Sequence, residues 1–159
     1  MGKENKVKAD AMALLLGYLR TQKELINKLL EGIKTGDTSN ETTTIHLAYL
    51  LHNLYCALED LFLEIMRTFE NRIEDPAKYH REILKRMIIE IPKIRPRILS
   101  KESYQMLDEL RGFRHIFRHS YTYSLSSDKV RNLKQSLLAA WDGIEKDIFD
   151  LERFLQKHL

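Results

Sequence analysis

One short segment of the chain concentrates side chains that can bind phosphate and move protons. The stretch "LRGFRHIFRHSYTYS", residues 110–124, holds three arginines, two histidines and two tyrosines. An arginine offers a planar fork of N–H donors to phosphoryl oxygens, and a histidine titrates near neutral pH. Arg114 and His119, brought together over one point, would therefore suit phosphate chemistry with proton transfer.

The spacing of this pair sets a condition on the local structure. On a continuous helix, residues five apart differ by about 140° of rotation, so Arg114 would lie over Arg111 and Arg118 instead. Convergence requires the helix to end near Phe117, and the polar residues that follow favour such an end. We expect His119 to lie on a turn, from which its ring can swing toward Arg114.

Simpler interpretations of the same residues stay open. Arginines at three- and four-residue steps are also typical of a solvated helix face. His115 and His119 are four apart, which is the spacing of a helical metal-binding pair. The nearest acids, Glu109 and Asp128, lack the spacing of a third ligand. We therefore expect a site that contains neither a metal nor another cofactor.

Apolar periodicity predicts the elements that must position these residues. Leucines and isoleucines recur at three- and four-residue steps through most of the chain, while prolines and glycines are few. Pro92 and Pro96 interrupt the pattern, and Ser100 is placed to cap the segment that carries the arginines and histidines. The sequence predicts an all-α, four-to-five-helix up-and-down bundle, with helices at about 5–34, 41–72, 76–90, a segment after Ser100, and 128–157.

Composition limits the class of protein. The 159 residues are 43% hydrophobic and 31% charged, which predicts a single soluble domain over residues 1–159. Cys56 is the one cysteine, so an internal disulfide is excluded. The sequence contains neither a recognisable leader nor a membrane-spanning run, and we expect a cytoplasmic protein. A formal net charge of +3 only weakly favours an anionic partner.

The segment also resembles a known family. Arg114-His115-x-x-x-His119, followed by Ser120-Tyr121, resembles the R-x4-H-x-Y motif of HepT-like toxins, which belong to the HEPN superfamily of helical ribonucleases. The residue after the arginine is usually Asn, Asp or His in that superfamily, and His115 fits. The motif lies at the end of the penultimate predicted helix, so the resemblance implies a HEPN-like fold.

The resemblance implies a specific activity and specific partners. It implies a metal-independent endoribonuclease toxin of a type VII-like toxin–antitoxin system, which cleaves RNA by 2′-hydroxyl attack at the interface of a homodimer. Arg114 and His119 would be the catalytic residues, supported by His115 and Arg118. An MNT-type nucleotidyltransferase antitoxin would silence the toxin by attaching AMP to Tyr121. The chain departs from short members of the family by an extended first loop and by the connector "IPKIRPR".

Two acids on the second predicted helix could support the site. The run "YCALEDLF" places Glu59 and Asp60 in an otherwise apolar stripe. One of them should point to solvent, and the other, which we take as Glu59, could pair with a site arginine or orient His119. His46 and His52 on the same helix are interpreted as packed or solvated polar residues.

A basic run offers a surface for RNA. Lys93, Arg95 and Arg97 lie in the connector, and Arg111 lies one turn before Arg114. A solvated face is the default interpretation, but in a ribonuclease these side chains would hold RNA phosphates without reading sequence. Two other function classes remain open at this point: a non-catalytic helical interaction module, and a regulatory module that binds a nucleotide.

Overall fold

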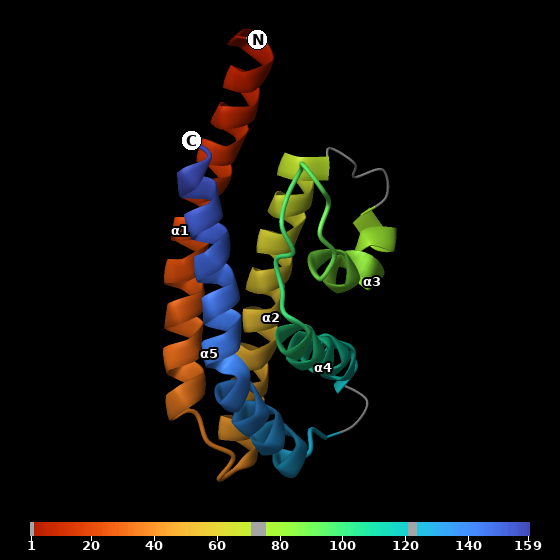
Figure 1. Cartoon of the computed structure of the whole chain (residues 1–159). Helices are drawn as coiled ribbons and strands as arrows, with labels where there is room; N and C mark the ends of the chain where they lie inside the picture. Colours follow the sequence, from red (N-terminus) through yellow and green to blue (C-terminus); the bar gives the residue numbers. More distant parts are fainter. Residues whose placement is uncertain (1, 71–75, 121–123) are drawn as a thin grey trace.

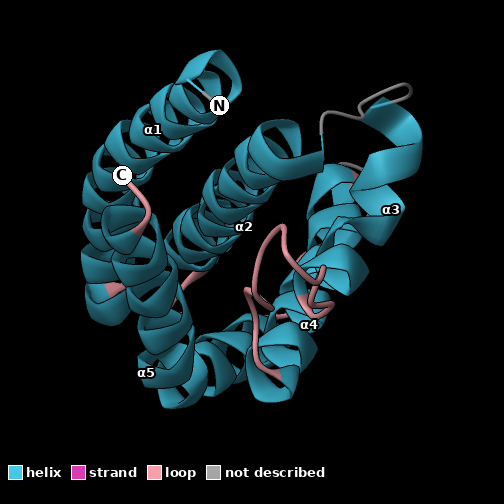
Figure 2. Ribbon diagram, turned by 45° about the horizontal axis from the view of Figure 1, so that its top comes forward, coloured by secondary structure: helices cyan, strands magenta, loops and turns pink. Residues whose placement is uncertain are grey.

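The structure of the protein is a computed structural model that describes residues 2–70, 76–120 and 124–159, with the backbone alone at residues 76–81. It contains five helices: α1 (Gly2–Thr35), α2 (Glu41–Glu70), α3 (Pro76–Met87), α4 (Lys101–Arg118) and α5 (Ser127–Lys157). Figure 2 shows that loops join them without a strand in the described part of the chain. The prediction of an all-α fold is confirmed.

Three long helices form the body of the bundle. In Figure 1, α1, α2 and α5 run side by side along the length of the molecule, with α1 and α2 antiparallel. The shorter α3 and α4 pack against α2 on the other side, and α4 also contacts α5. The first turns of α1 extend past the other helices at the top of the view. The described helices therefore pack together as one bundle, as the periodicity predicted.

One hydrophobic core joins all five helices. The central helix α2 is apolar over most of its circumference, as expected for a helix covered by neighbours on several sides. Each fully buried leucine, isoleucine or phenylalanine contributes about 1.5–3 kcal/mol of transfer free energy. The side chains of α2 that are fully removed from solvent are Leu47, Ala48, Leu51, Leu54, Tyr55, Leu58, Leu61, Phe62, Ile65 and Met66.

Helix starts follow the expected capping chemistry. The Ser100 hydroxyl accepts a hydrogen bond from the Ser103 amide at 3.2 Å, which confirms Ser100 as the N-cap of α4. The Ser100 amide and hydroxyl also donate to Asp147 of α5, at 2.9 and 3.1 Å. The start of α4 is thus fixed both to its own first turn and to α5.

The connector between α3 and α4 ends the third helix earlier than expected. The sequence predicted a helix to about residue 90, but α3 ends at Met87. The Met87 carbonyl accepts hydrogen bonds from the amides of Ile98 and Leu99, at 2.8 and 3.0 Å. Because these bonds tie the returning connector to the end of α3, the chain turns away there instead of continuing the helix.

Candidate functional site

The end of α4 has the form that the motif requires. The helix ends at Arg118, and His119 is its C-cap, with φ −105° and ψ 10°. The His119 amide donates to the carbonyls of Ile116 and Phe117. The helix end therefore falls within one residue of the expected position at Phe117.

Arg114 is anchored by a buried glutamate of α2. Its Nη1 donates to Glu59 Oε1 at 3.0 Å and to Oε2 at 3.2 Å. The Glu59 side chain is only 4% exposed, against 24% for Arg114. Of the two roles left open for Glu59, the structure shows pairing with a site arginine. Because neither bond involves Nη2, the partly exposed guanidinium keeps a geometry that can accept a second anion.

His119 lies against His115, not against the arginine. The two imidazole rings are 4.5 Å apart between centroids and tilted by 60°. This is the usual meeting of side chains four residues apart on one helix face. Arg114 therefore contacts α2, whereas His119 contacts a residue of its own helix. The expected swing of His119 toward Arg114 is not the arrangement found.

A second layer of polar side chains on α2 was missed from the sequence. His52, Cys56 and Glu59 are spaced by four and three residues, which places them on one face of α2. His52 Nε2 lies 3.6 Å from Cys56 Sγ, and the His52 ring packs on Phe117 at 5.0 Å between centroids. The spacing to Glu59 was the signal that could have placed His52 at the site.

The electrostatics of this layer reflect the nearby arginines. Burial lowers the pKa of His52, and the positive charges of Arg114 and Arg118 lower it further. His52 is therefore neutral at pH 7. Burial also raises the pKa of the Cys56 thiol, so that this group stays protonated. On this face of α2, His52 and Cys56 are therefore uncharged, and Glu59 is the group that pairs with a cation of α4.

Two buried polar atoms at the site lack hydrogen-bond partners in the described part of the chain. They are Arg114 Nε and His52 Nδ1. A buried donor or acceptor without a partner costs about 1–3 kcal/mol, so such atoms are rare in folded proteins. Nearby, burial and the charge of Glu59 raise the pKa of the Tyr55 phenol.

The outer arginines of the segment reach the surface. Arg118 is exposed at the last turn of α4. Arg111 pairs with Asp108 one turn earlier, and both side chains are about two-fifths exposed. An exposed pair of this kind is weak, because solvent screens it. Both arginine side chains are therefore accessible to an anionic ligand and can bind it.

The connector does not behave as one basic surface. Arg95 is buried, with Nη2 donating to Glu70 Oε1 at 2.6 Å and Nη1 donating to the Ile89 carbonyl at 2.9 Å. Its guanidinium holds the connector to α2, which corrects the expectation that Arg95 contacts RNA. Lys93, in a turn with φ 66°, and Arg97 are both exposed.

The connector is also distant from the arginine of the motif. Glu70, which holds Arg95, lies about three helical turns along α2 from Glu59. Lys93 lines a hollow with Lys8 and His158, at the end of the bundle where α1 begins and α5 ends. Lys93 and Arg97 are therefore separate from the cluster around Arg114, and only an extended ligand could reach both.

The described residues include only some of those to which the remaining expectations apply. Tyr121 lies outside the described residues, as does Tyr123. Within residues 2–70, 76–120 and 124–159, histidine, cysteine and acidic side chains do not gather in threes at metal-binding distance. None of the helices in these ranges is long and apolar enough to cross a membrane.

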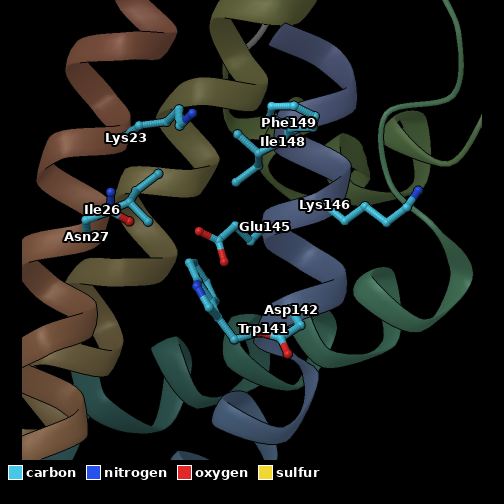
Figure 3. Close-up of a pocket in the computed structure, with 9 residues that line it drawn as sticks. All are labelled: Lys23, Ile26, Asn27, Trp141, Asp142, Glu145, Lys146, Ile148 and Phe149. Atoms are coloured by element: carbon cyan, nitrogen blue, oxygen red, sulfur yellow. The ribbon is translucent and has the colours of Figure 1, made fainter. Parts of the chain in front are cut away.

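A separate hollow of about 400 Å³ lies between α1 and α5. Figure 3 shows Trp141 and Glu145 reaching from α5 toward Ile26 of α1. Its lining residues come from these two helices alone, and none belongs to the segment at the end of α4. This hollow is a groove between helices and is distinct from the candidate site.

Comparison with family models identifies the same family as the sequence resemblance. A model of a family described as HepT-like protein matches residues 46–155, a range that includes most of α2, all of α3 and α4, and most of α5. Neither the curated proteins nor the solved structures contain a match. The matched range covers more than half of the chain and contains both Glu59 and Arg114. The chain therefore belongs to the family of HepT-like proteins.

Proposed function

We propose that this protein is a metal-independent endoribonuclease, the toxin of a type VII-like toxin–antitoxin system. The observation that carries the proposal is the placement of Arg114 on the buried Glu59, five residues before His119 at the exposed end of α4. An anchored guanidinium and a histidine at the same helix end suit the binding and cleavage of a phosphodiester. Membership of the HepT-like family supports the same activity.

The proposed reaction needs only groups of the protein and of the RNA. His119 takes the proton from a ribose 2′-hydroxyl, and the 2′-oxygen attacks the adjacent phosphorus. The bond from phosphorus to the 5′-oxygen breaks, and that oxygen leaves with the proton that His119 returns to it. The products are a 2′,3′-cyclic phosphate and a 5′-hydroxyl. Arg114 stabilises the charge that develops on the non-bridging oxygens.

The neighbours of this pair have supporting roles in the proposal. Glu59 holds the Arg114 guanidinium in one orientation through two hydrogen bonds. His115 packs on the His119 ring and limits its movement. Arg118 and Arg111 attract the RNA backbone near the cleaved bond, while Lys93 and Arg97 contact a more distant part of the same RNA. An arginine that is already held in the reactive orientation lowers the activation barrier more than a mobile arginine does.

A homodimer completes the proposed site. The end of α4 is exposed, and one chain alone leaves it open to water. A second copy related by two-fold symmetry would close the site, and would bring a second Arg114 and His119 into the same cleft.

Tyr121 is the proposed control point. An MNT-type nucleotidyltransferase antitoxin would attach AMP to its hydroxyl, two residues after His119. The added phosphate and bulk would repel and exclude RNA from a site lined by arginines. Peptide mass spectrometry after co-expression with such a partner tests this step. Modification confined to Tyr123 would show that the wrong tyrosine is assigned.

The reaction itself is tested with a substrate that lacks the attacking group. A mixed-sequence RNA and the matching oligomer with 2′-deoxy sugars throughout are incubated with the protein and a chelator. We expect cleavage of the RNA alone, with cyclic phosphate ends detected by mass spectrometry. Cleavage of the deoxy oligomer, or products with a 5′-phosphate, would exclude 2′-hydroxyl attack.

A further inference from the structure

The hollow between α1 and α5 has the size and the lining of a small-molecule site. Its volume of about 400 Å³ falls within the range of ligand pockets, which is roughly 300–1,000 Å³. Its floor is apolar, since Ile26 of α1 and Ile148 of α5 are only 2% and 5% exposed. Trp141 of α5, which is 6% exposed, reaches toward Ile26 (Figure 3). The hollow therefore offers an apolar floor and one large aromatic ring to a ligand.

Two carboxylates of the hollow are open to a ligand. Glu145 reaches from α5 toward α1, beside Trp141 (Figure 3). Within the described part of the chain, neither Glu145 nor Asp142 has a hydrogen-bond or ion-pair partner, and both are exposed. Residues three apart are neighbours on a helix surface, so one ligand can contact both carboxylates.

The lysines that line the same hollow are already paired. Lys23 Nζ donates to Glu152 at 2.6 Å, and this hydrogen bond is the main reason why the pKa of Glu152 is lowered. Lys146 Nζ donates to Asp150 at 3.0 Å, and Figure 3 shows the Lys146 side chain directed away from α1. An anionic ligand would have to compete with these carboxylates for the lysines. A cationic ligand would instead meet carboxylates that are still open.

The aromatic rings favour a cation for a second reason. The face of an aromatic ring attracts a positive charge, and an indole does so more strongly than a phenyl ring. Phe149, at the rim of the hollow, already has the Arg153 guanidinium 5.9 Å from its ring centroid. Among the described residues, Trp141 has neither such a cation nor an acceptor for its indole N–H. This largely buried ring is therefore the unoccupied aromatic group of the hollow.

We propose that the hollow between α1 and α5 binds a free organic dication, a small molecule with positive groups at both ends of an alkyl chain. One positive group pairs with Glu145 and lies against the face of Trp141. The alkyl chain covers Ile26 and Ile148, and the second positive group pairs with Asp142. The hollow is separate from the end of α4, so this inference does not depend on the proposed ribonuclease activity.

The test uses agmatine, a butyl chain with a guanidinium at one end and an ammonium at the other. Trp141 is the one tryptophan of the chain, so its indole N–H resonance reports on this hollow alone. We expect agmatine to shift this resonance in a saturable way, with a dissociation constant of about 1 mM or lower. N-butylurea has a chain of the same length without a charge, and it should leave the resonance unchanged.

A matched pair of variants tests the role of the carboxylate. Glu145→Gln keeps the size of the side chain and removes its charge, so the dissociation constant of agmatine should rise about 10-fold. The control is Glu109→Gln, because Glu109 is an exposed glutamate of α4 that lies outside the hollow. It should leave the affinity unchanged. A response that does not saturate, equal responses to agmatine and N-butylurea, or an unchanged affinity in Glu145→Gln would overturn the proposal.

A blocked arginine, N-acetylarginine methylamide, separates a free ligand from an arginine side chain of a partner protein. It carries one positive charge in place of two, so it should bind about 10-fold more weakly than agmatine does. Equal affinities would assign the hollow to an arginine of a partner and would overturn the small-molecule source. Because these readouts do not involve RNA, their failure would leave the proposed ribonuclease activity standing.

Discussion

At the scale of single residues, the site depends on one ion pair across two helices. Glu59 is almost completely buried and accepts both hydrogen bonds from Arg114 Nη1. A buried carboxylate requires such a partner, because its desolvation is costly. The pair therefore both stabilises the contact between α2 and α4 and fixes the guanidinium that we propose to act on RNA.

Removing Arg114 should cost more stability than removing the whole pair. We expect Arg114→Leu to lower the free energy of unfolding by about 2 kcal/mol, since Glu59 is left buried without its partner. The double variant Glu59→Leu/Arg114→Leu should recover most of this loss. Urea denaturation of the two proteins gives the comparison. A double variant less stable than Arg114→Leu would show that the buried charge is not the source of the cost.

His52 should make the fold sensitive to acid. Burial and the two arginines lower its folded pKa below the ordinary value of 6.5, so the unfolded chain binds the proton more readily. Above pH 6.5, His52 is neutral in both the folded and the unfolded chain. As the pH falls from 6.5 through the folded pKa, the unfolded chain takes up the proton first, so the free energy of unfolding decreases. His52→Phe keeps a ring against Phe117 and should remove the contribution of His52 to the loss of stability in acid.

The measurement is the free energy of unfolding at pH 7.5 and pH 5.5. His46→Phe is the control, because His46 is an exposed histidine on the same helix. It should keep the acid-dependent loss of the wild type. An equal loss in His52→Phe would assign the pH dependence to other groups.

At the scale of elements, α4 is positioned by its first turn and by the contact of its last turns with α2. Ser100 caps the helix and bonds to Asp147, while Phe117 packs on His52 at the other end. These contacts hold the helix that carries the motif across the bundle. The precision of the site therefore depends on α2 and α5 as much as on α4 itself.

Loss of the Ser100 cap should be measurable. We expect Ser100→Ala to destabilise the protein by about 1 kcal/mol, because the Ser103 amide loses its acceptor and Asp147 loses a donor. Ser126→Ala removes the corresponding cap of α5, which is exposed and lacks such a link in the described residues. In chemical denaturation, Ser126→Ala should lower the free energy of unfolding by less than Ser100→Ala does. The opposite order would mean that Asp147 contributes nothing to this junction.

The sequence predicted elements better than contacts. Apolar spacing located all five helices, because each buries one side and obeys the helical period. The end of α3 was placed about a turn too late, since the bonds from Ile98 and Leu99 that stop it come from residues further along the chain.

Buried polar contacts were the part that the sequence left undetermined. Arg95 and Arg97 look alike in the sequence, yet only Arg95 meets Glu70 and is buried. The pairing of Glu59 with an arginine was one of two alternatives, and His52 was not assigned to the site. Such choices depend on which helix faces are brought together, which local spacing does not specify.

At the scale of the whole molecule, the basic end of the bundle should determine RNA affinity. Each phosphate contact to single-stranded nucleic acid contributes about 0.7 to the slope of log affinity against log salt. We expect Arg118→Ala to weaken RNA binding and to reduce this slope by about that amount, measured by fluorescence anisotropy. Lys146→Ala, an exposed cation on α5, is the control and should leave both values unchanged. An unchanged slope in Arg118→Ala would remove Arg118 from the RNA surface.

The central claim is that this HepT-like bundle cleaves RNA through the histidine at the end of α4. The most direct measurement is the rate of RNA cleavage, with chelator present, by the wild type, His119→Ala and His158→Ala. His158 is the C-cap of α5 with nearly the same backbone angles as His119, so its loss matches the structural change. We expect His119→Ala to be slower by about 10² to 10⁴-fold and His158→Ala to match the wild type. Equal rates for His119→Ala and the wild type would contradict the account.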